Sequence, residues 1–326
     1  MRTRRVADHP LAVHPLILGG NVFGWTAAAE ASHAVLDAFL DGGGTAVDTA
    51  NTYSAWAPGN PGGVSERIIG DWLRVRGARD RVFVATKVGM EGGDFPKGLG
   101  RDAIRRGIEG SLQRLGVDRV DLYYAHEDDP ATPLEETVAA FGELVEEGLI
   151  GLAGASNYST ARFAEALDVA DRLGVPGFRV LQPEFNLIDR DGVDGDPSRE
   201  GFPDRLRDLC LRRGVGVMPY WTLARGFLTG KYREGGPAPD SPRAAGVLAT
   251  YGGPRPRAAL ALLDEIAAAH GATPAQIALA WLMAYPAVVG PIASATTPEQ
   301  VRELLGAADV VLSDDEVARL NAAGGR

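Results

Sequence analysis

The feature that most constrains this chain is a series of short apolar runs that alternates with longer stretches of helical periodicity. Eight runs occur in 326 residues, and most begin about 28 to 38 residues after the one before. A strand with its returning helix takes roughly 30 residues. The runs are rich in Val, Ile and Leu without strict alternation, which is typical of strands buried on both faces. They are Leu16–Gly20, Thr45–Ala50, Val82–Val88, Val120–His126, Ile150–Ser156, Phe178–Asn186, Val215–Tyr220 and Val288–Ser294.

The stretches between the runs predict amphipathic helices. Residues 101–115 and 134–147 place apolar side chains at every third or fourth position, which forms one apolar stripe on a helix. Three further helices have a strong start signal, in which a Thr or Ser is followed three residues later by Gln or Glu. These starts are Thr273, Thr297 and Ser313. The longer segments 54–64, 89–100, 187–200 and 232–256 are predicted to be irregular and to follow strands.

Eight strands that are each followed by a helix predict a (β/α)8 TIM barrel, with residues 1–326 forming a single domain. The alternative is an open, doubly wound sheet. That fold would place a Gly-x-Gly-x-x-Gly turn after an early strand, and the sequence has none there. The barrel is therefore the predicted fold, and its irregular segments should lie over the carboxyl ends of the strands.

The composition disfavours several classes of function. The formal charge is −10, which argues against a nucleic-acid partner. Cys210 is the only cysteine, so the chain has no internal disulfide and no multi-cysteine metal site. Residues 271–298 carry no charge, but Pro and Gly interrupt them, so they predict a helix and a strand rather than a membrane span. No apolar run follows the basic start of the chain, and a soluble, cytoplasmic protein is expected.

Side chains suited to acid–base chemistry stand at the ends of the early strands. Asp48 is predicted to end the second strand with Tyr53 five residues later, Lys87 the third, and His126 the fourth. In a barrel these positions converge on one mouth. The Lys87 ammonium would stabilise a phenolate and lower the tyrosine pKa from ~10. Tyr53 could then protonate a carbonyl oxygen, with His126 as a second donor and Asp48 orienting the lysine.

Each of these four residues also has a structural explanation when taken alone. Asp48 and Lys87 could pair between neighbouring strands, His126 could be a core histidine, and Tyr53 could anchor a loop. Their coincidence at matching strand ends favours a shared function. Lys87 could instead form a Schiff base, although the neighbouring carboxylate should keep its amine charged. A metal site is disfavoured, because only one of the five histidines lies at a strand end.

Six motifs stand in order along the chain, most of them at these strand ends. They are Val47–Ser54, Ala85–Gly89, Asp121–His126, Gly154–Asn157, Gln182–Asn186 and Gly226–Lys231. With these motifs the sequence resembles the aldo-keto reductase superfamily over nearly its whole length. The resemblance implies a (β/α)8 barrel that reduces aldehydes or ketones with NAD(P)H. It also implies a catalytic tetrad of Asp48, Tyr53, Lys87 and His126.

The resemblance implies a nicotinamide cofactor, with NADP(H) preferred and NAD(H) possible. Ser156, Asn157 and Gln182 would hold the carboxamide. Phe185 stands where the family usually has a tyrosine that stacks on the nicotinamide ring, and its aromatic face would be retained. The loop near the pyrophosphate would contain four further contacts. These are Tyr220, Leu223, Arg225 and Gly226.

The last strand-to-helix turn departs from the family pattern. Gln300 stands where a basic residue often meets the adenosine 2′-phosphate, whereas Glu303 retains the acidic residue that often holds the adenine amino group. Without that cation, a 2′-phosphate would depend on hydroxyls, backbone amides and the helix N-terminus. Ser294 and Thr296 would supply the hydroxyls. This departure weakens the expectation of NADP(H) over NAD(H).

The substrate pocket is predicted to have an aromatic wall, which suits sugars, flat rings and apolar aldehydes alike. The expected wall residues beside Tyr53 are Phe23, Trp25, Trp56, Tyr124 and Trp221, of which Tyr124 could equally belong to the core. A small carbonyl compound is the expected partner, and the oligomeric state cannot be read from the sequence. The alternative function is a non-catalytic, cofactor-binding sensor, as found among the potassium-channel auxiliary subunits of this family.

Overall fold

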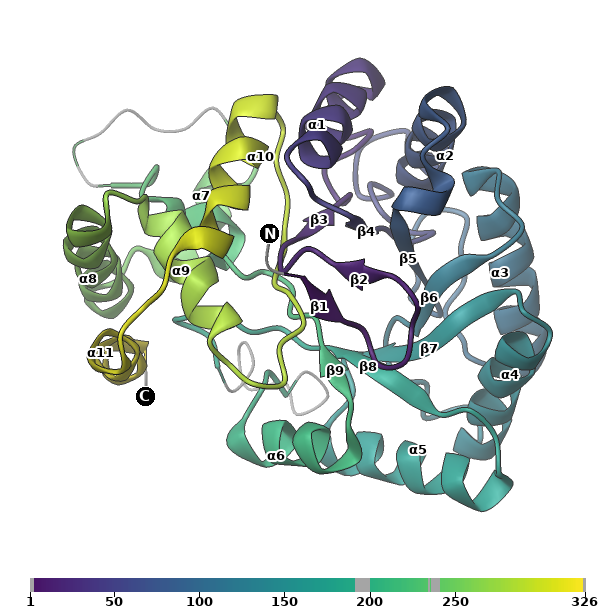
Figure 1. The fold of residues 1–326 in the computed structure, drawn as a ribbon. Helices are drawn as coiled ribbons and strands as arrows, with labels where there is room; N and C mark the ends of the chain where they lie inside the picture. Colours follow the sequence, from purple (N-terminus) through teal and green to yellow (C-terminus); the bar gives the residue numbers. More distant parts are fainter. Residues whose placement is uncertain (1–2, 191–199, 234, 236–240, 325–326) are drawn as a thin grey trace.

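The chain forms the predicted (β/α)8 barrel in a computed structural model that describes residues 3–190, 200–233, 235 and 241–324 (Figure 1). All eight barrel strands pair in parallel, in the order β10-β3-β4-β5-β6-β7-β8-β9. Each predicted run contains one of them. The strands are β3 (Ile17–Gly19), β4 (Ala46–Asp48), β5 (Phe83–Val88), β6 (Val120–Ala125), β7 (Ile150–Ser156), β8 (Phe178–Gln182), β9 (Gly216–Val217) and β10 (Ile292–Ala293).

The barrel closes at a seam between its two shortest strands, β9 and β10, which have two residues each. Backbone hydrogen bonds cross this seam from Val217 N to Ala287 O at 2.9 Å and from Val289 N to Val217 O at 2.8 Å. A third bond joins Ile292 N to Pro219 O at 2.9 Å. The segment that precedes β10 therefore contributes as much to closure as β10 itself.

An antiparallel hairpin, β1 (Arg4–Arg5) and β2 (Ala12–Val13), lies across the end of the barrel where the strands begin (Figure 1). Val6 and Val13 are fully buried and belong to the apolar cluster inside the barrel, together with Phe83 and Leu122. This hairpin covers the amino-terminal end, so the open end of the barrel is the carboxyl end of the strands.

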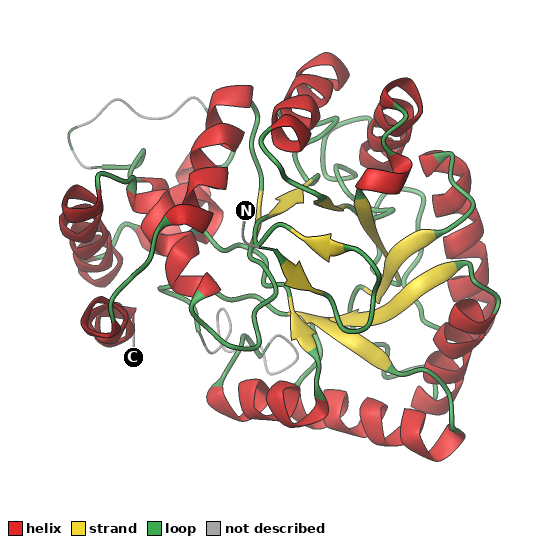
Figure 2. Cartoon of the chain, viewed as in Figure 1, coloured by secondary structure: helices red, strands yellow, loops and turns green. Residues whose placement is uncertain are grey.

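Helices surround the sheet on its outer side (Figure 2). A helix such as α2 buries one apolar stripe, formed by Ile69, Trp72 and Leu73, whereas α11 packs on α8 outside the ring. The α-helices are α1 (Ala29–Asp41), α2 (Val64–Arg76), α3 (Arg101–Leu115), α4 (Leu134–Glu146), α5 (Thr160–Leu173), α6 (Asp204–Arg213), α7 (Ala244–Tyr251), α8 (Pro254–His270), α9 (Pro274–Met283), α10 (Pro298–Leu305) and α11 (Asp314–Gly324). The 3-10 helices are η1 (Arg79–Arg81), η2 (Ala224–Thr229) and η3 (Gly306–Asp309).

The predicted helix starts agree with the structure in most respects. Thr273 forms the reciprocal capping box with Gln276, and Ser313 exchanges hydrogen bonds with Glu316. Thr297 accepts from the backbone of Gln300, but the Gln300 side chain turns back to Thr296 instead. The prediction that 232–256 is irregular is wrong where α7 lies, whose short apolar sequence gave little periodic signal. Part of this segment, like most of 187–200, lies outside the described residues.

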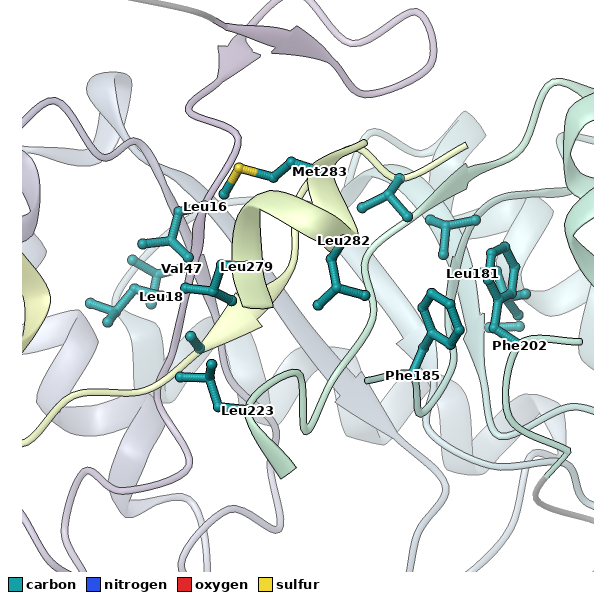
Figure 3. Packing of buried hydrophobic residues seen from close by; sticks show 14 of the residues in the cluster. Leu16, Leu18, Val47, Leu181, Phe185, Phe202, Leu223, Leu279, Leu282 and Met283 are labelled. Carbon is teal, nitrogen blue, oxygen red and sulfur yellow. The ribbon is translucent and has the colours of Figure 1, made fainter. Parts of the chain in front are cut away.

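The main apolar cluster fills the space between the sheet and the helices (Figure 3). Helix α9 is buried along most of its length, and Leu279 packs with Leu16 and Leu18 of the first barrel strand region in this cluster. Because α9 is buried in the core, it contains no charged residue. The uncharged composition of 271–298 therefore reflects burial in the protein rather than a membrane span. Throughout the described ranges, no helix has both the length and the apolar character that a membrane crossing requires.

Candidate active site

A cavity of about 770 Å³ lies at the carboxyl ends of the strands, within the size range of small-molecule sites. Its wall is built from the ends of β4, β6, β7, β8 and β10 and from the segments that follow them. Sixteen residues that the sequence singled out line it. They are Asp48, Tyr53, Trp56, His126, Ser156, Asn157, Gln182, Tyr220, Trp221, Leu223, Arg225, Gly226, Ser294, Thr296, Gln300 and Glu303.

A tight ionic cluster lies at the base of this cavity. Lys87 is fully buried, and its Nζ lies 2.8 and 2.7 Å from the two carboxylate oxygens of Asp48. The same ammonium lies 2.8 Å from the Thr49 carbonyl oxygen and 2.7 Å from the Tyr53 hydroxyl. The Tyr53 hydroxyl donates to Asp48 Oδ2 at 2.9 Å. Three side chains from two neighbouring strand ends and the loop after β4 thus share one set of hydrogen bonds.

The electrostatics of this cluster differ from the sequence prediction. Burial, followed by the neighbouring Asp48 carboxylate, raises the pKa of Tyr53 well above its ordinary value. The expected lowering by Lys87 does not prevail, because burial and the Asp48 carboxylate outweigh it; burial separately lowers the pKa of Lys87. Tyr53 is therefore a neutral phenol over the ordinary pH range, and a neutral phenol is the form that can give up a proton.

His126 lies beside this cluster, directly after the end of β6. Its ring is edge-on to Tyr53, with the two ring centroids 6.0 Å apart. Asn157 Nδ2 donates to the His126 carbonyl oxygen at 2.9 Å, and the Tyr220 hydroxyl donates to Asn157 Oδ1 at 2.7 Å. These contacts connect the ends of β6, β7 and β9 across the cavity wall.

Gln182 contributes a contact that the sequence did not predict. Its side-chain amide donates to Asp48 Oδ1 at 2.9 Å, so the carboxylate accepts from Lys87, Tyr53 and Gln182 together. Ser156 Oγ donates to the Gln182 carbonyl oxygen at 2.8 Å and thereby supports the end of β8. Such a fully satisfied carboxylate fixes the position of every donor around it.

Phe185 is not where the sequence prediction placed it. The residue is 2% exposed, and its ring packs against Phe202, Trp281 and Tyr285 with centroids 5.2 to 5.3 Å away (Figure 3). Its position just past β8 turns the ring toward the helices, whereas Gln182 faces the cavity. Phe185 therefore cannot stack on a ligand in this cavity, and Tyr220 supplies an aromatic ring to the cavity wall instead.

Three members of the predicted aromatic wall also lie elsewhere. Phe23 and Tyr124 are fully buried, Phe23 in the outer core and Tyr124 inside the barrel, where its hydroxyl lies 3.4 Å from Met218 Sδ. Trp25 does not line the cavity but stands edge-on to Trp56, which does, with centroids 5.6 Å apart. An alternating strand and its loop present both inward and outward aromatics, and sequence alone does not separate them.

Two cations that the sequence analysis did not assign to a site line the same cavity, although one of them closes the motif Gly226–Lys231. Lys231 and Arg243 join the predicted Arg225 there, and no acidic side chain forms an ion pair with any of the three in the part of the chain that the structure describes. The Arg225 guanidinium lies 3.8 Å from the Trp221 ring centroid, and that of Arg243 lies 4.6 Å from Trp25. Burial lowers the pKa of Lys231 and of Arg243. Three cations without carboxylate partners are suited to a polyanionic ligand.

Strained backbone is concentrated around this cavity. In the described part of the chain, six non-glycine residues have positive φ, and five of them belong to the cavity wall or adjoin it: Ser54, Asn157, Trp221, Ala224 and Arg225. Each such residue costs of order 1–3 kcal/mol, so the surrounding structure must hold it in place. Strain of this kind gathers at functional sites and independently marks this end of the barrel.

Over the described ranges, no group of three or more His, Cys, Asp or Glu residues is arranged to hold a metal ion.

The structure thus combines a (β/α)8 barrel with a Tyr–Lys–Asp cluster beside a cation-lined cavity. The sequence model of the Aldo/keto reductase family matches residues 15–324, and the chain belongs to this family. It is 34% identical over 325 residues to a probable voltage-gated potassium channel subunit beta of Oryza sativa, covering 95% of this chain and 92% of that protein. It is 32% identical over 309 residues to L-glyceraldehyde 3-phosphate reductase of Escherichia coli (92% and 85%). A third relative is aldo-keto reductase str7 of Strobilurus tenacellus, 34% identical over 288 residues (87% and 78%).

Proposed function

We propose that this protein is an NAD(P)H-dependent carbonyl reductase that converts an aldehyde or ketone to an alcohol. The observation that carries the proposal is the Tyr53 hydroxyl, which lies in the cavity wall 2.7 Å from the buried Lys87 ammonium. A phenol in that position can protonate a carbonyl oxygen that approaches from the cavity. Membership of the Aldo/keto reductase family supports the same reaction class.

The side chains of the cluster divide the work as follows. Tyr53 gives its proton to the carbonyl oxygen, and Lys87 stabilises the phenolate that remains until solvent returns a proton. Asp48 keeps Lys87 charged and oriented, while Gln182 fixes the carboxylate through its own hydrogen bond. His126 offers a second polar contact to the same oxygen. When bound, the nicotinamide cofactor supplies the hydride that adds to the carbonyl carbon as its π bond to oxygen breaks.

The cofactor proposed for this site is NADP(H), with NAD(H) as the weaker ligand. Arg225, Lys231 and Arg243 together offer three positive charges to the phosphates, more than a pyrophosphate alone needs. Gln300 accepts hydrogen bonds from Thr296 N and Oγ1, so it is already engaged within the turn. Selection of a 2′-phosphate is therefore assigned to the cations and not to this turn.

The residues proposed for the nicotinamide end are revised in one respect. Ser156, Asn157 and Gln182 remain the polar groups for the carboxamide, because all three line the cavity. Tyr220 replaces Phe185 as the stacking aromatic, since its ring belongs to the cavity wall and Phe185 does not. The hydrogen bond from the Tyr220 hydroxyl to Asn157 holds that ring in place.

The geometry disfavours the Schiff-base alternative. A lysine nucleophile needs a neutral amine with access to the substrate. Lys87 is fully buried, does not line the cavity, and has four oxygen atoms within hydrogen-bonding distance. A carbonyl compound in the cavity meets the Tyr53 hydroxyl, and the Asp48 carboxylate is the next ionic group in the wall.

The second candidate function is that of a cofactor-binding regulatory protein. The similarity to a probable voltage-gated potassium channel subunit beta favours it, at 34% identity over 95% of this chain. Both functions predict cofactor binding, but only the reductase predicts turnover that depends on Tyr53. Tight binding of NADPH with no turnover on any aldehyde would favour the regulatory function.

The test combines cofactor titration with a matched pair of variants. Quenching of tryptophan fluorescence by NADPH and by NADH measures binding directly. Tyr53→Phe should bind NADPH as the parent does but lose about 10²–10⁴-fold in aldehyde reduction. Tyr123→Phe is the control, because its buried hydroxyl has no hydrogen-bond partner among the described residues and lies outside the cavity wall. Undiminished turnover by Tyr53→Phe would remove Tyr53 from the acid role.

A further inference from the structure

Trp56 is the one large aromatic side chain in the described structure that stands half in solvent. It is 50% exposed, whereas Trp72 and Trp281 are 1% and 0% exposed. The exposed ring also lines the cavity that contains the Tyr53 hydroxyl. A large apolar surface left open within a concave site, rather than scattered on a convex surface, is characteristic of a ligand contact.

The ring of Trp56 lies next to Tyr53, the residue proposed to protonate the carbonyl oxygen. It is inclined at 60° to the Tyr53 ring with centroids 6.1 Å apart, and at 86° to Trp25 with centroids 5.6 Å apart. A group attached to a carbonyl that is hydrogen-bonded to Tyr53 therefore has an indole surface as an immediate neighbour. Aromatic rings gain about 0.5–1.5 kcal/mol in such offset or edge-to-face contacts beyond the area they bury.

The backbone holds this aromatic corner in advance of any ligand. Ser54, between Tyr53 and Trp56, has φ of 68°, and its buried Oγ donates to the Phe23 carbonyl oxygen at 2.7 Å. The bond ties the loop after β4 to the loop that carries Trp25. A rigid surface loses little conformational entropy when it binds, so a strained but anchored turn is suited to selecting one ligand shape.

Apart from Arg243, whose guanidinium lies 4.6 Å from the Trp25 ring centroid, the cavity residues named here around this corner are uncharged. The cavity residues Val22, Thr26, Thr52 and Met90, which come from the same two loops and the end of β5, carry no charge. Among the described cations of the cavity, only Arg243 contacts this corner, and its guanidinium is stacked on Trp25 rather than on Trp56. The surface beside Trp56 is thus mainly apolar, with Arg243 on the far ring of the corner as its one described cation.

We infer that Trp56 is a specificity-determining residue that selects carbonyl compounds with an uncharged aromatic ring close to the C=O group. The inference rests on the proposed function, because it assigns the carbonyl oxygen to Tyr53. It also distinguishes this protein from the relative named for L-glyceraldehyde 3-phosphate, whose substrate is small and phosphorylated.

The experiment compares phenylacetaldehyde with cyclohexylacetaldehyde, which differ only in the aromaticity of a ring one carbon away from the carbonyl. We expect the parent protein to have the higher kcat/KM for phenylacetaldehyde, and Trp56→Leu to lose about three- to tenfold on that substrate and less on the saturated one. Trp56→Phe should regain most of the loss. Val75→Ala, at an exposed apolar residue of α2 outside the cavity, is the control and should keep the parent ratio.

A binding measurement separates failure of this inference from failure of the proposed function. Calorimetric titration with 2-phenylethanol and 2-cyclohexylethanol should show the same preference and the same loss in Trp56→Leu, whether or not the protein turns over. Absent turnover with this preference intact would reject the reductase and keep the aromatic site. Equal losses on both rings, or better turnover of glyceraldehyde 3-phosphate than of phenylacetaldehyde, would overturn the role of Trp56.

Discussion

The two ends of the barrel each contain a buried carboxylate with a cation and a ring, yet the two clusters are built for different tasks. At the carboxyl end, Asp48 is hydrogen-bonded to Lys87 and Tyr53 beside an open cavity. At the amino end, Asp121 accepts from Arg79 at 2.9 Å and pairs with His9 at 3.3 Å beneath the β1–β2 hairpin. Similar sets of groups, a carboxylate with a cation and a ring, are thus assigned to the proposed reaction at one end and to holding the hairpin at the other.

What separates the two clusters is the protein around them. Asp121 also accepts from Val84 N, so it joins the hairpin residue His9 to the start of β5 and faces no cavity. Around Asp48, by contrast, the backbone is strained, and the cavity wall contains three cations that have no carboxylate partner in the described ranges. Residue type alone therefore does not identify a reactive site; the exposure of one donor to a cavity does.

The largest effect should come from Lys87→Met, which removes one partner of the reactive cluster. An unpaired buried Asp48 costs about 3–5 kcal/mol of unfolding free energy. Turnover should fall about 10²–10⁴-fold. The double variant Asp48→Asn/Lys87→Met should recover most of the stability in urea unfolding but none of the turnover. Recovery of both would mean that the cluster is structural.

A smaller effect is expected from Lys231→Gln, which removes one cation from the cavity wall. Hydrogen bonds to charged groups contribute about 1.5–3 kcal/mol, so NADPH affinity should fall about tenfold or more. NADH affinity should fall less, because NADH carries no 2′-phosphate. Fluorescence titration of both cofactors gives the ratio. An equal loss for both would assign Lys231 to the pyrophosphate instead.

Asp121→Asn should weaken the Asp121 cluster at the amino end of the barrel and leave turnover at the carboxyl end intact. Loss of its charged hydrogen bonds should lower the unfolding free energy by about 1.5–3 kcal/mol. Although burial alone would raise the pKa of Asp121, hydrogen bonds from His9, Arg79 and Val84 lower it in the folded state. The stabilisation is thus present above the unfolded pKa of ~3.9 and is lost as pH falls through the lower folded value.

Turnover at pH 7 is the check on that comparison, and it should stay within about twofold of the parent for a substitution this far from the cavity. Urea unfolding at pH 7 and at pH 3 should show the difference between Asp121→Asn and the parent shrinking in acid. A loss of turnover as large as that of Lys87→Met would show that the amino end takes part in the reaction.

The smallest effect is predicted for pH. Because burial and Asp48 raise the pKa of Tyr53, the phenol stays protonated, and the single-turnover rate of reduction should be flat up to about pH 9. The rate should decline only as pH rises through the raised pKa, above the ordinary tyrosine value of ~10. A decline centred near pH 7 to 8 would mean that Lys87 lowers the pKa after all.

Much of the fold could be predicted from the sequence, because strands buried on both faces leave an unmistakable spacing of apolar runs. The same spacing placed Asp48, Lys87 and His126 at strand ends, and the structure brings them to one end of the barrel. Their roles remain a proposal. Side-chain direction within loops and at strand ends was beyond the sequence, so Phe23, Tyr124 and Phe185 were assigned to a cavity that they do not reach.

The cations were missed for a different reason. Lys231 and Arg243 follow η2 in a segment without periodicity, and their significance comes from having no carboxylate partner among the residues that the structure describes. Only three-dimensional packing reveals that absence. The pKa of Tyr53 was predicted wrongly for a similar reason. The sequence identified Lys87, whose charge would lower that pKa, but it could not weigh burial against this charge.

The narrow closure between β9 and β10 has a mechanical consequence. Tyr220 and Arg225 follow β9 on one side of that junction, and Ser294 and Gln300 follow β10 on the other. A dinucleotide that contacts residues on both sides would hold the two sides of the β9–β10 junction together. Its binding would then appear as resistance to heat and as slower amide exchange at Val217 and Val289, even in a variant that has lost all chemistry.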